Sequence, residues 1–317
     1  MQSTRVAFGV CAWLATAAAC SPAPVAQTSA LSADGASIPW GAGLGQLGLR
    51  PTVGEIQTKG PSALALDPHG RAVVVDRYNG RVVRFAGGSA EVLFAAPEDT
   101  DLIAVGDDGA IVIYSALHAH IEIFAPGGIA QGGIEVPRAL GELRAITLGA
   151  SRRVSVSTAL QERYELGSPS FPLPLEVVLA SKQEGTHALP EHRGLAIRTD
   201  KREVSLLIAS AGAERSTTQV RRLPGLADAA QLVGVDGAIA CARLETLHPG
   251  ASIALDRRLV CLDVNTGAVT LDRALPALGL YLPRTELTMT HGVVALMTPL
   301  EGGMAFTRYA IVGGGAR

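Results

Sequence analysis

Residues 60–85 decide the fold, and they read GPSALALDPHGRAVVVDRYNGRVVRF. The stretch holds three short apolar runs, at 62–66, 72–75 and 81–85. They are separated by DPHG and DRYNG, which carry the Asp, Pro, Asn and Gly residues typical of tight turns. Short apolar runs between such turns are typical of antiparallel strands. The stretch therefore predicts a β-meander of three strands.

The same stretch resembles an NHL repeat, a blade of the β-propeller fold. The resemblance lies in a Pro, a small apolar strand, an Asp, a Gly turn, a Val-rich strand ending in Asp, and then Asn, Arg and an aromatic residue. The matching residues are Pro61, Ala63, Leu64, Ala65, Asp67, Gly70, Val73, Val74, Val75, Asp76, Asn79, Arg81 and Phe85. The resemblance implies that Asp76 and Arg81 hold the blade to itself, with Asp76 accepting hydrogen bonds from turn amides and from the arginine.

Weaker copies of this unit follow along the chain. One blade cannot cover its own faces, so a propeller needs repeats at intervals of roughly 40 residues. Six units are found, at irregular intervals. Their first turns fall at Gly70, Gly109, Ser151, Lys201, Gly237 and Gly292. The sequence therefore predicts an all-β, six-bladed propeller, or a seven-bladed one if residues 53–58 begin a blade of their own.

The two longest intervals between units predict loop insertions, at 168–193 and at 275–283. We expect the ring to be closed by residues 53–58, which would join the last blade beside residues 309–312. Closure of this kind removes exposed sheet edges. Helical patterns are confined to short stretches such as 158–165, which argues against alternating helices and parallel strands.

The first nineteen residues read as a signal peptide. They contain one charged residue, Arg5, followed by an apolar run that is too short to span a membrane, which takes about 20 residues. The run ends in small residues before Cys20, an arrangement that resembles the lipobox of bacterial lipoproteins. We expect cleavage before Cys20 and a lipid on that cysteine. The alternative is ordinary cleavage after Ala19, which would leave Cys20 as an exposed thiol in an oxidising compartment.

Residues 20–37 are expected to form a flexible tether, because small and polar residues dominate them and no apolar periodicity is present. The propeller domain would then occupy residues 38–317. This organisation predicts a protein anchored to a membrane of the cell envelope and facing the periplasm or the exterior. Ser21 after the lipidated cysteine slightly favours the outer membrane.

Two cysteines remain once Cys11 has left with the leader and Cys20 carries the lipid. Cys241 and Cys261 lie in apolar stretches that a turn-rich segment separates. Neighbouring antiparallel strands would bring them together, so we predict a disulfide. The alternative is a pair of buried free thiols.

The charge of the chain singles out no class of charged partner. It has 27 basic and 29 acidic residues, and only 4% of its residues are aromatic. A polyanion such as nucleic acid is therefore not expected to bind, and a stacking platform for bases or sugars has little support.

His118 and His120 are the best metal candidates, because an H-x-H pair on a strand places both rings on one face. Some NHL-like enzymes, the peptidyl-amidoglycolate lyases, hold zinc with histidines at the mouth of the propeller channel. A third ligand would have to come from His69, His187, His192, His248 or His291. Nothing in the sequence ranks these five, so a metal site is not the leading expectation.

Three further motifs are interpreted as structural. Residues 107–109 (DDG) predict a hairpin turn, because the alternating oxygen ligands of a calcium loop are missing. The glycine-rich stretches 41–48 and 127–133 lack the lysine and the strand-then-helix setting of a phosphate loop, so both are expected to be flexible loops.

The sequence thus predicts an exported, lipid-anchored β-propeller that binds or scaffolds another envelope protein or envelope component. Catalytic residues and cofactors are not expected. The insertions 168–193 and 275–283 would carry the binding, because loops on a rigid scaffold commonly carry function. The alternatives are a metal-dependent hydrolase or lyase that uses His118 and His120 at the channel mouth, and a purely structural subunit of an envelope assembly.

Overall fold

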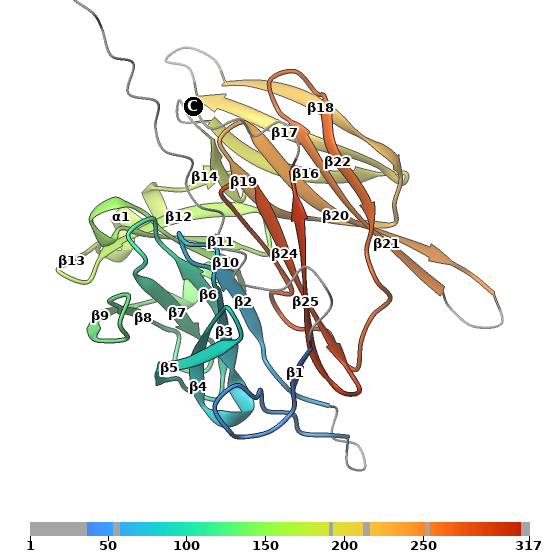
Figure 1. Cartoon of the computed structure of the whole chain (residues 1–317). Coiled ribbons are helices and arrows are strands. Elements are labelled where there is room, and N and C mark those ends of the chain that lie inside the picture. Colours follow the sequence, from blue (N-terminus) through green and yellow to red (C-terminus); the bar gives the residue numbers. More distant parts are fainter. Residues whose placement is uncertain (1–36, 53–57, 190–192, 212–215, 251–253, 312–317) are drawn as a thin grey trace, which may run out of the picture.

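The computed structural model describes residues 37–52, 58–189, 193–211, 216–250 and 254–311. These residues form six antiparallel sheets around a central channel, so the protein is a six-bladed β-propeller (Figure 1). The predicted all-β fold and the blade number are both confirmed.

Each blade is a meander whose strands run in chain order from the channel outward, except that the first strand of the chain completes the last blade. Blade 1 comprises β2 (Ala63–Leu66), β3 (Ala72–Asp76), β4 (Arg81–Ala86) and β5 (Ser89–Ala95); blade 2 comprises β6 (Thr100–Val105), β7 (Ile111–Ser115), β8 (His120–Phe124) and β9 (Ala130–Glu135); blade 3 comprises β10 (Leu143–Leu148), β11 (Val154–Thr158), β12 (Glu162–Ser168), β13 (Phe171–Pro172) and β14 (Gln183–Glu184). Blade 4 comprises β15 (His187–Leu189), β16 (Arg193–Asp200), β17 (Glu203–Ala211) and β18 (Ser216–Leu226); blade 5 comprises β19 (Ala229–Asp236), β20 (Ile239–His248), β21 (Ala254–Asp263) and β22 (Val269–Ala274); blade 6 comprises β23 (Leu287–Thr290), β24 (Val293–Leu300), β25 (Gly303–Ala310) and β1 (Ser37–Pro39).

The second strand of blade 1 explains the Val-rich run in the sequence. Every residue of β3 is buried, because both of its faces are covered by neighbouring blades. Val74 packs with Met297 and Phe306 of blade 6, whereas Val73 and Val75 pack in the core shared with blade 2. A strand that is covered on both sides needs apolar residues at every position, not at alternate ones.

Five apolar clusters of this kind hold the described part of the ring together. They lie between blades 1 and 2, 2 and 3, 4 and 5, 5 and 6, and 6 and 1. Within the described residues, no such cluster joins blades 3 and 4. The contacts there include polar ones: the Gln161 side chain accepts a hydrogen bond from the Ile197 amide at 2.9 Å, and the Ser157 hydroxyl donates to the Thr186 carbonyl at 2.5 Å.

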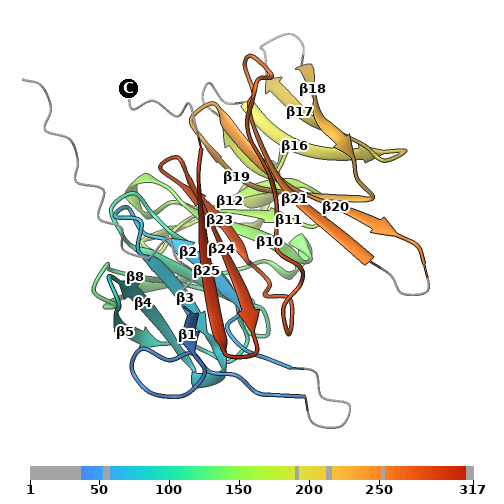
Figure 2. The same ribbon diagram turned by 45° about the vertical axis from the view of Figure 1, so that its right-hand side comes forward.

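The strand that closes the ring lies earlier in the chain than predicted. Ser37, Ile38 and Pro39 of β1 pair with Ala305, Met304 and Gly303 of β25, so the first and last parts of the described chain lie side by side (Figure 2). We expected residues 53–58 to form the closing strand, and this prediction is wrong for Thr58, which lies in no strand. The rest of that segment, 53–57, and residue 312 fall outside the described residues. A three-residue strand is too short to produce a periodic pattern.

The segment 168–193 is not a loop insertion, contrary to the prediction. It supplies β13, the helix α1 (Leu175–Ala180) and β14 at the outer edge of blade 3, and then β15, the innermost strand of blade 4. Because β15 precedes β16, the turn at Lys201 is the second turn of its blade and not the first. This shift by one strand accounts for the unequal intervals on either side of that landmark.

Other local expectations had mixed outcomes. Residues 158–165 form the turn between β11 and β12 together with the start of β12, not a helix. Residues 275–283 are a loop without strands, as predicted, and Tyr281 anchors it by donating a hydrogen bond to the Pro61 carbonyl at 3.1 Å. The glycine-rich stretch 127–133 is only partly loop, because its second half belongs to β9.

Three 3-10 turns, at Arg77–Asn79, Arg138–Leu140 and Ala150–Arg152, complete the regular structure. Among the described residues, no helix combines the length and the apolar character needed to cross a membrane.

Candidate binding site at the lower mouth of the channel

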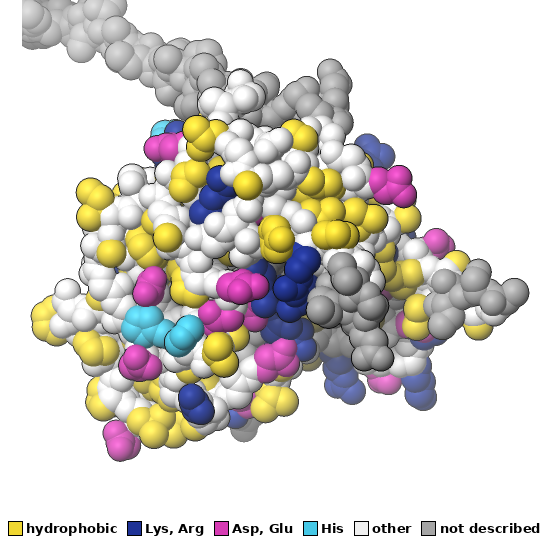
Figure 3. Space-filling model, turned by 90° about the horizontal axis from the view of Figure 1, so that it is seen from below, with side chains coloured by type: hydrophobic (Ala, Val, Ile, Leu, Met, Phe, Trp, Pro, Cys, Tyr) yellow, Lys and Arg dark blue, Asp and Glu magenta, His cyan; other side chains and the backbone are white. Residues whose placement is uncertain are grey.

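The innermost strands of all six blades begin at the same end of the ring, the lower end in Figure 1. We call this opening the lower mouth and define it by five side chains that line its cavities, Arg144, His187, Gln231, Arg243 and Arg284. Seen from below, Lys and Arg side chains gather near the middle of the face, with Asp and Glu side chains beside them (Figure 3).

Two adjoining cavities open here. One of about 350 Å³ follows the channel between the innermost strands, and one of about 320 Å³ lies where blades 3 and 4 meet without an apolar cluster. Arg144, His187, Gln231 and Arg243 line both cavities. Each volume falls at the lower end of the range of small-molecule sites, roughly 300–1,000 Å³.

A network of two arginines and two glutamates forms the wall on the side of blades 5 and 6. Glu286 is buried and forms ion pairs with both Arg243 and Arg257. Glu245 lies 3.1 Å from the Arg243 guanidinium and 3.7 Å from that of Arg257. Because the two carboxylates share the same two guanidinium groups, the network is balanced in charge.

Arg284, from the segment that leads into blade 6, and Arg144 of blade 3 share one carboxylate, Glu142. Arg284 donates to Glu142 at 2.5 Å and to the Leu143 carbonyl at 2.9 Å, and Arg144 contacts the same glutamate at 3.3 Å. The hydrogen bond from Arg284 is the main cause that lowers the pKa of the Glu142 carboxyl, so this group stays ionised. Glu142 does not line either cavity, whereas Arg144 does.

His187 enters the channel from β15, and its Nδ1 atom lies 3.0 Å from the Thr186 hydroxyl. Burial, with a smaller contribution from the nearby Arg163, lowers the pKa of this imidazole from 6.5 to about 4. The ring is therefore neutral at pH 7. It adds polar surface to the mouth without adding charge.

The predicted histidine pair lies elsewhere on the same face. His118 is in the turn before β8, 2.8 Å from the Ser115 hydroxyl, and His120 begins β8 with its Nδ1 atom 3.2 Å from Glu135. Both histidines line one shallow hollow together with Glu122. Within the described part of the chain, no three His, Cys, Asp or Glu side chains lie close enough together to hold a metal ion.

The five other histidines do not supply the missing ligand among the described residues. His69 and His291 lie in turns at the upper end of the ring, His187 lines the channel, and His248 pairs with Asp256 on the blade 5 hairpin. His192 falls outside the described residues.

Asp76 and Arg81 form the ion pair that the resemblance implied, at 2.8 Å. Asp76 accepts from the side-chain amide of Asn79 in the Asn-Gly turn, at 2.8 Å, and also from the backbone amide of Gly48, at 2.8 Å. Arg81 also donates to the Ala42, Gly43 and Gln46 carbonyls at 3.0–3.1 Å. The network thus ties the N-terminal loop to blade 1, which corrects the expectation that it serves the blade alone. The glycine-rich stretch 41–48 is a loop with many hydrogen bonds.

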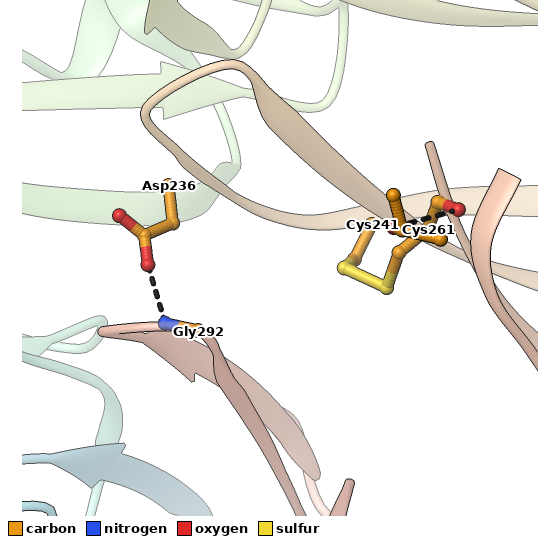
Figure 4. Close-up of a disulfide and its surroundings, with 5 residues drawn as sticks. Asp236, Cys241, Cys261 and Gly292 are labelled. Atoms are coloured by element: carbon orange, nitrogen blue, oxygen red, sulfur yellow. Dashed lines mark hydrogen bonds between the residues drawn. A yellow bond between two sulfur atoms is a disulfide. The ribbon is translucent and has the colours of Figure 1, made fainter. Parts of the chain in front are cut away.

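Cys241 and Cys261 form the predicted disulfide (Figure 4). They are register partners on β20 and β21, with their Cα atoms 4.0 Å apart, and both are fully buried between blades 5 and 6. Nearby, the Asp236 carboxylate accepts a hydrogen bond from the Gly292 amide across the same two blades, at 2.5 Å. Cys20 lies outside the described residues, so its lipidation stays a prediction.

The predicted turn at 107–109 is confirmed as the hairpin between β6 and β7, where Asp108 accepts from the Ala110 amide at 3.1 Å.

Sequence reasoning missed the polar residues of the lower mouth. A signal for them exists: Asp101, Arg144, His187, Gln231 and Glu286 all lie at or next to the beginning of an innermost strand. Alignment of the six repeats would have placed them together.

The fold and the site define a class, a six-bladed β-propeller with a polar cavity at one mouth of its channel. No protein-family model matches the sequence, and no curated protein is similar to it. Similar solved structures include hydrazine synthase of Kuenenia stuttgartiensis (11% identity, 78% of this chain and 80% of that chain, TM-score 0.46) and a gluconolactonase of Xanthomonas campestris (14%, 80% and 87%, 0.41). Virginiamycin B lyase of Staphylococcus aureus is also similar (11%, 79% and 80%, 0.37). At these TM-scores the likenesses carry no argument about activity.

Proposed function

We propose that this protein is an exported, lipid-anchored β-propeller of the cell envelope that binds a small ligand at the lower mouth. The observation that carries the proposal is the pair of adjoining cavities that share four polar side chains, Arg144, His187, Gln231 and Arg243. Concave sites with a few convergent polar groups are where proteins bind small molecules. Blade 1 is proposed to be an NHL-type repeat that has kept its Asp and Arg.

This site replaces the insertion at 168–193 as the expected binding element, because that segment is built into blades 3 and 4. The loop 275–283 keeps a role beside the mouth: its end, together with Arg284, borders a hollow of about 760 Å³ next to the channel. The alternative of a metal-dependent hydrolase or lyase is not favoured by any observation on His118 and His120.

The binding site is tested by blocking it. Purified full-length protein is incubated with a small-molecule extract of the cell envelope, and the retained compounds are identified by mass spectrometry. Ala145 lines both cavities, so Ala145→Trp fills them. The matched control is Ile129→Trp, at an exposed turn at the other end of the ring. A compound retained by the wild type and the control but lost from Ala145→Trp supports the proposal; equal retention by all three contradicts it.

The anchor is tested separately by growing cells with radiolabelled fatty acid. We expect label on the wild type and none on Cys20→Ser, because the thiol is the attachment point. Equal labelling of the two proteins would remove the lipid anchor from the proposal.

A further inference from the structure

The cavity of about 320 Å³ between blades 3 and 4 is lined by two glutamine side chains whose amide oxygens already accept hydrogen bonds. The Gln161 Oε1 atom accepts from the Ile197 amide at 2.9 Å, and the Gln231 Oε1 atom accepts from Arg243 at 2.8 Å. Each amide oxygen is engaged, so each side chain presents its NH₂ group. Neither NH₂ group has an acceptor among the described residues, although both side chains line the cavity. A polar group left without a partner in a cavity favours a ligand that supplies one.

The charges around the cavity point to the same kind of ligand. The lining glutamate, Glu245, is already matched by Arg243 and Arg257. Arg144 is different, because its one ion-pair partner among the described residues, Glu142, is also held by Arg284 at a shorter distance, 2.5 Å against 3.3 Å. The Arg144 side chain is 48% exposed and lines both cavities. Because Arg284 holds Glu142 more closely and also faces Asp101, the Arg144 guanidinium is the less tightly held of the two and stays available at the mouth.

Taken together, the lining supplies the NH₂ groups of two glutamines and the exposed guanidinium of Arg144. We propose that the lower mouth binds a small organic anion, whose carboxylate or phosphate group pairs with Arg144 and accepts hydrogen bonds from the NH₂ groups of Gln161 and Gln231. Arginine suits this role because its guanidinium donates two parallel hydrogen bonds to an oxyanion. Neutral His187 contributes polar contact without competing for charge. This inference rests on the proposed function and names the ligand class.

The test is isothermal titration calorimetry on the full-length protein at neutral pH, with four probes: citrate, inorganic phosphate, glycerol and tetramethylammonium. The variants are Arg144→Gln, which removes the charge, and Arg144→Lys, which keeps it. The control is Arg152→Gln, because Arg152 forms an ion pair with Asp108 at the opposite end of the ring, at 3.1 Å. Thermal unfolding of each variant confirms that it is folded.

We expect citrate, phosphate or both to bind the wild type and the control, and the two anions separate carboxylate from phosphate recognition. Arg144→Gln should weaken the binding by roughly tenfold to a hundredfold, the range for loss of a charge-assisted hydrogen bond, and Arg144→Lys should weaken it less. The inference is overturned if neither anion binds more tightly than glycerol or tetramethylammonium, or if Arg144→Gln binds anions as well as the wild type does.

The two proposals can fail separately. A neutral or cationic compound that the extract experiment shows to depend on the open mouth, without anion binding in the calorimeter, would overturn the ligand class and leave the binding site in place. Anion binding that Ala145→Trp does not reduce would overturn the lower mouth as the site.

Discussion

Removal of the disulfide should destabilise the protein by an amount that the chain separation sets. Cys241 and Cys261 are 20 residues apart in sequence. In the chain-entropy model, a cross-link that closes a loop of this size restricts the unfolded chain by an amount worth about 3 kcal/mol. We therefore expect the Cys241→Ala/Cys261→Ala double variant to lose about 3 kcal/mol of unfolding free energy. For a domain of this size the melting temperature would fall by roughly 6–12 °C.

The assay is urea unfolding followed by circular dichroism, with and without a reducing agent. Reduction should lower the stability of the wild type towards that of the double variant and leave the double variant unchanged, since it has no bond to break. Both cysteines are fully buried, and alanine leaves little space behind. A loss below about 1 kcal/mol, or a wild type insensitive to complete reduction, would refute the entropic reasoning.

Two further predictions concern the described polar groups. His187 has a pKa of about 4 in the folded protein against 6.5 ordinarily, so the unfolded chain takes up its proton first and stability falls as pH drops from 6.5 to 4, by at most about 3 kcal/mol. In His187→Gln the difference in stability between pH 7.5 and pH 4.5, measured by urea unfolding, should be smaller; an unchanged difference would contradict this assignment. Asp76→Ala should cost about 3 kcal/mol, because it leaves the largely buried Arg81 without its carboxylate. Thermal unfolding and limited proteolysis within residues 41–48 would measure this, and unaltered cleavage there would show that the loop does not depend on Asp76.

The sequence was most informative where strands are covered on both faces and turns carry their characteristic residues. In blade 1 the run at 72–75 and the turn at Gly70 were sufficient to predict the strands. β1 and β15 were missed because three-residue strands such as SIP and HAL have too few residues to show a pattern. Their place in the ring is fixed by strand pairing. β1 pairs with β25, at the other end of the described chain, and β15 pairs with its neighbour β16.

The disulfide could be predicted because, with Cys11 assigned to the expected leader and Cys20 to the expected lipid, the two remaining cysteines allow only one pairing, and the turn-rich link between them suits a hairpin. The lower mouth could not be predicted in the same way. Arg144, His187 and Gln231 come from three different blades, and what relates them in the sequence is only a position near the start of an innermost strand, which emerges once the repeats are aligned. They converge only when the ring closes and brings the starts of the innermost strands to one opening.

The way in which the ring closes also determines how the molecule bears mechanical tension. A pull on the N-terminus reaches β1 first, and only three residue pairs hold β1 on β25. Directly behind it, the loop 41–48 is fastened to blade 1 by Asp76 and Arg81. Blade 6 and blade 1 therefore both resist the pull, and the Asp76–Arg81 ion pair still holds the chain after β1 has separated from β25. A propeller built this way would resist being unrolled from its N-terminal end even after its shortest strand has separated.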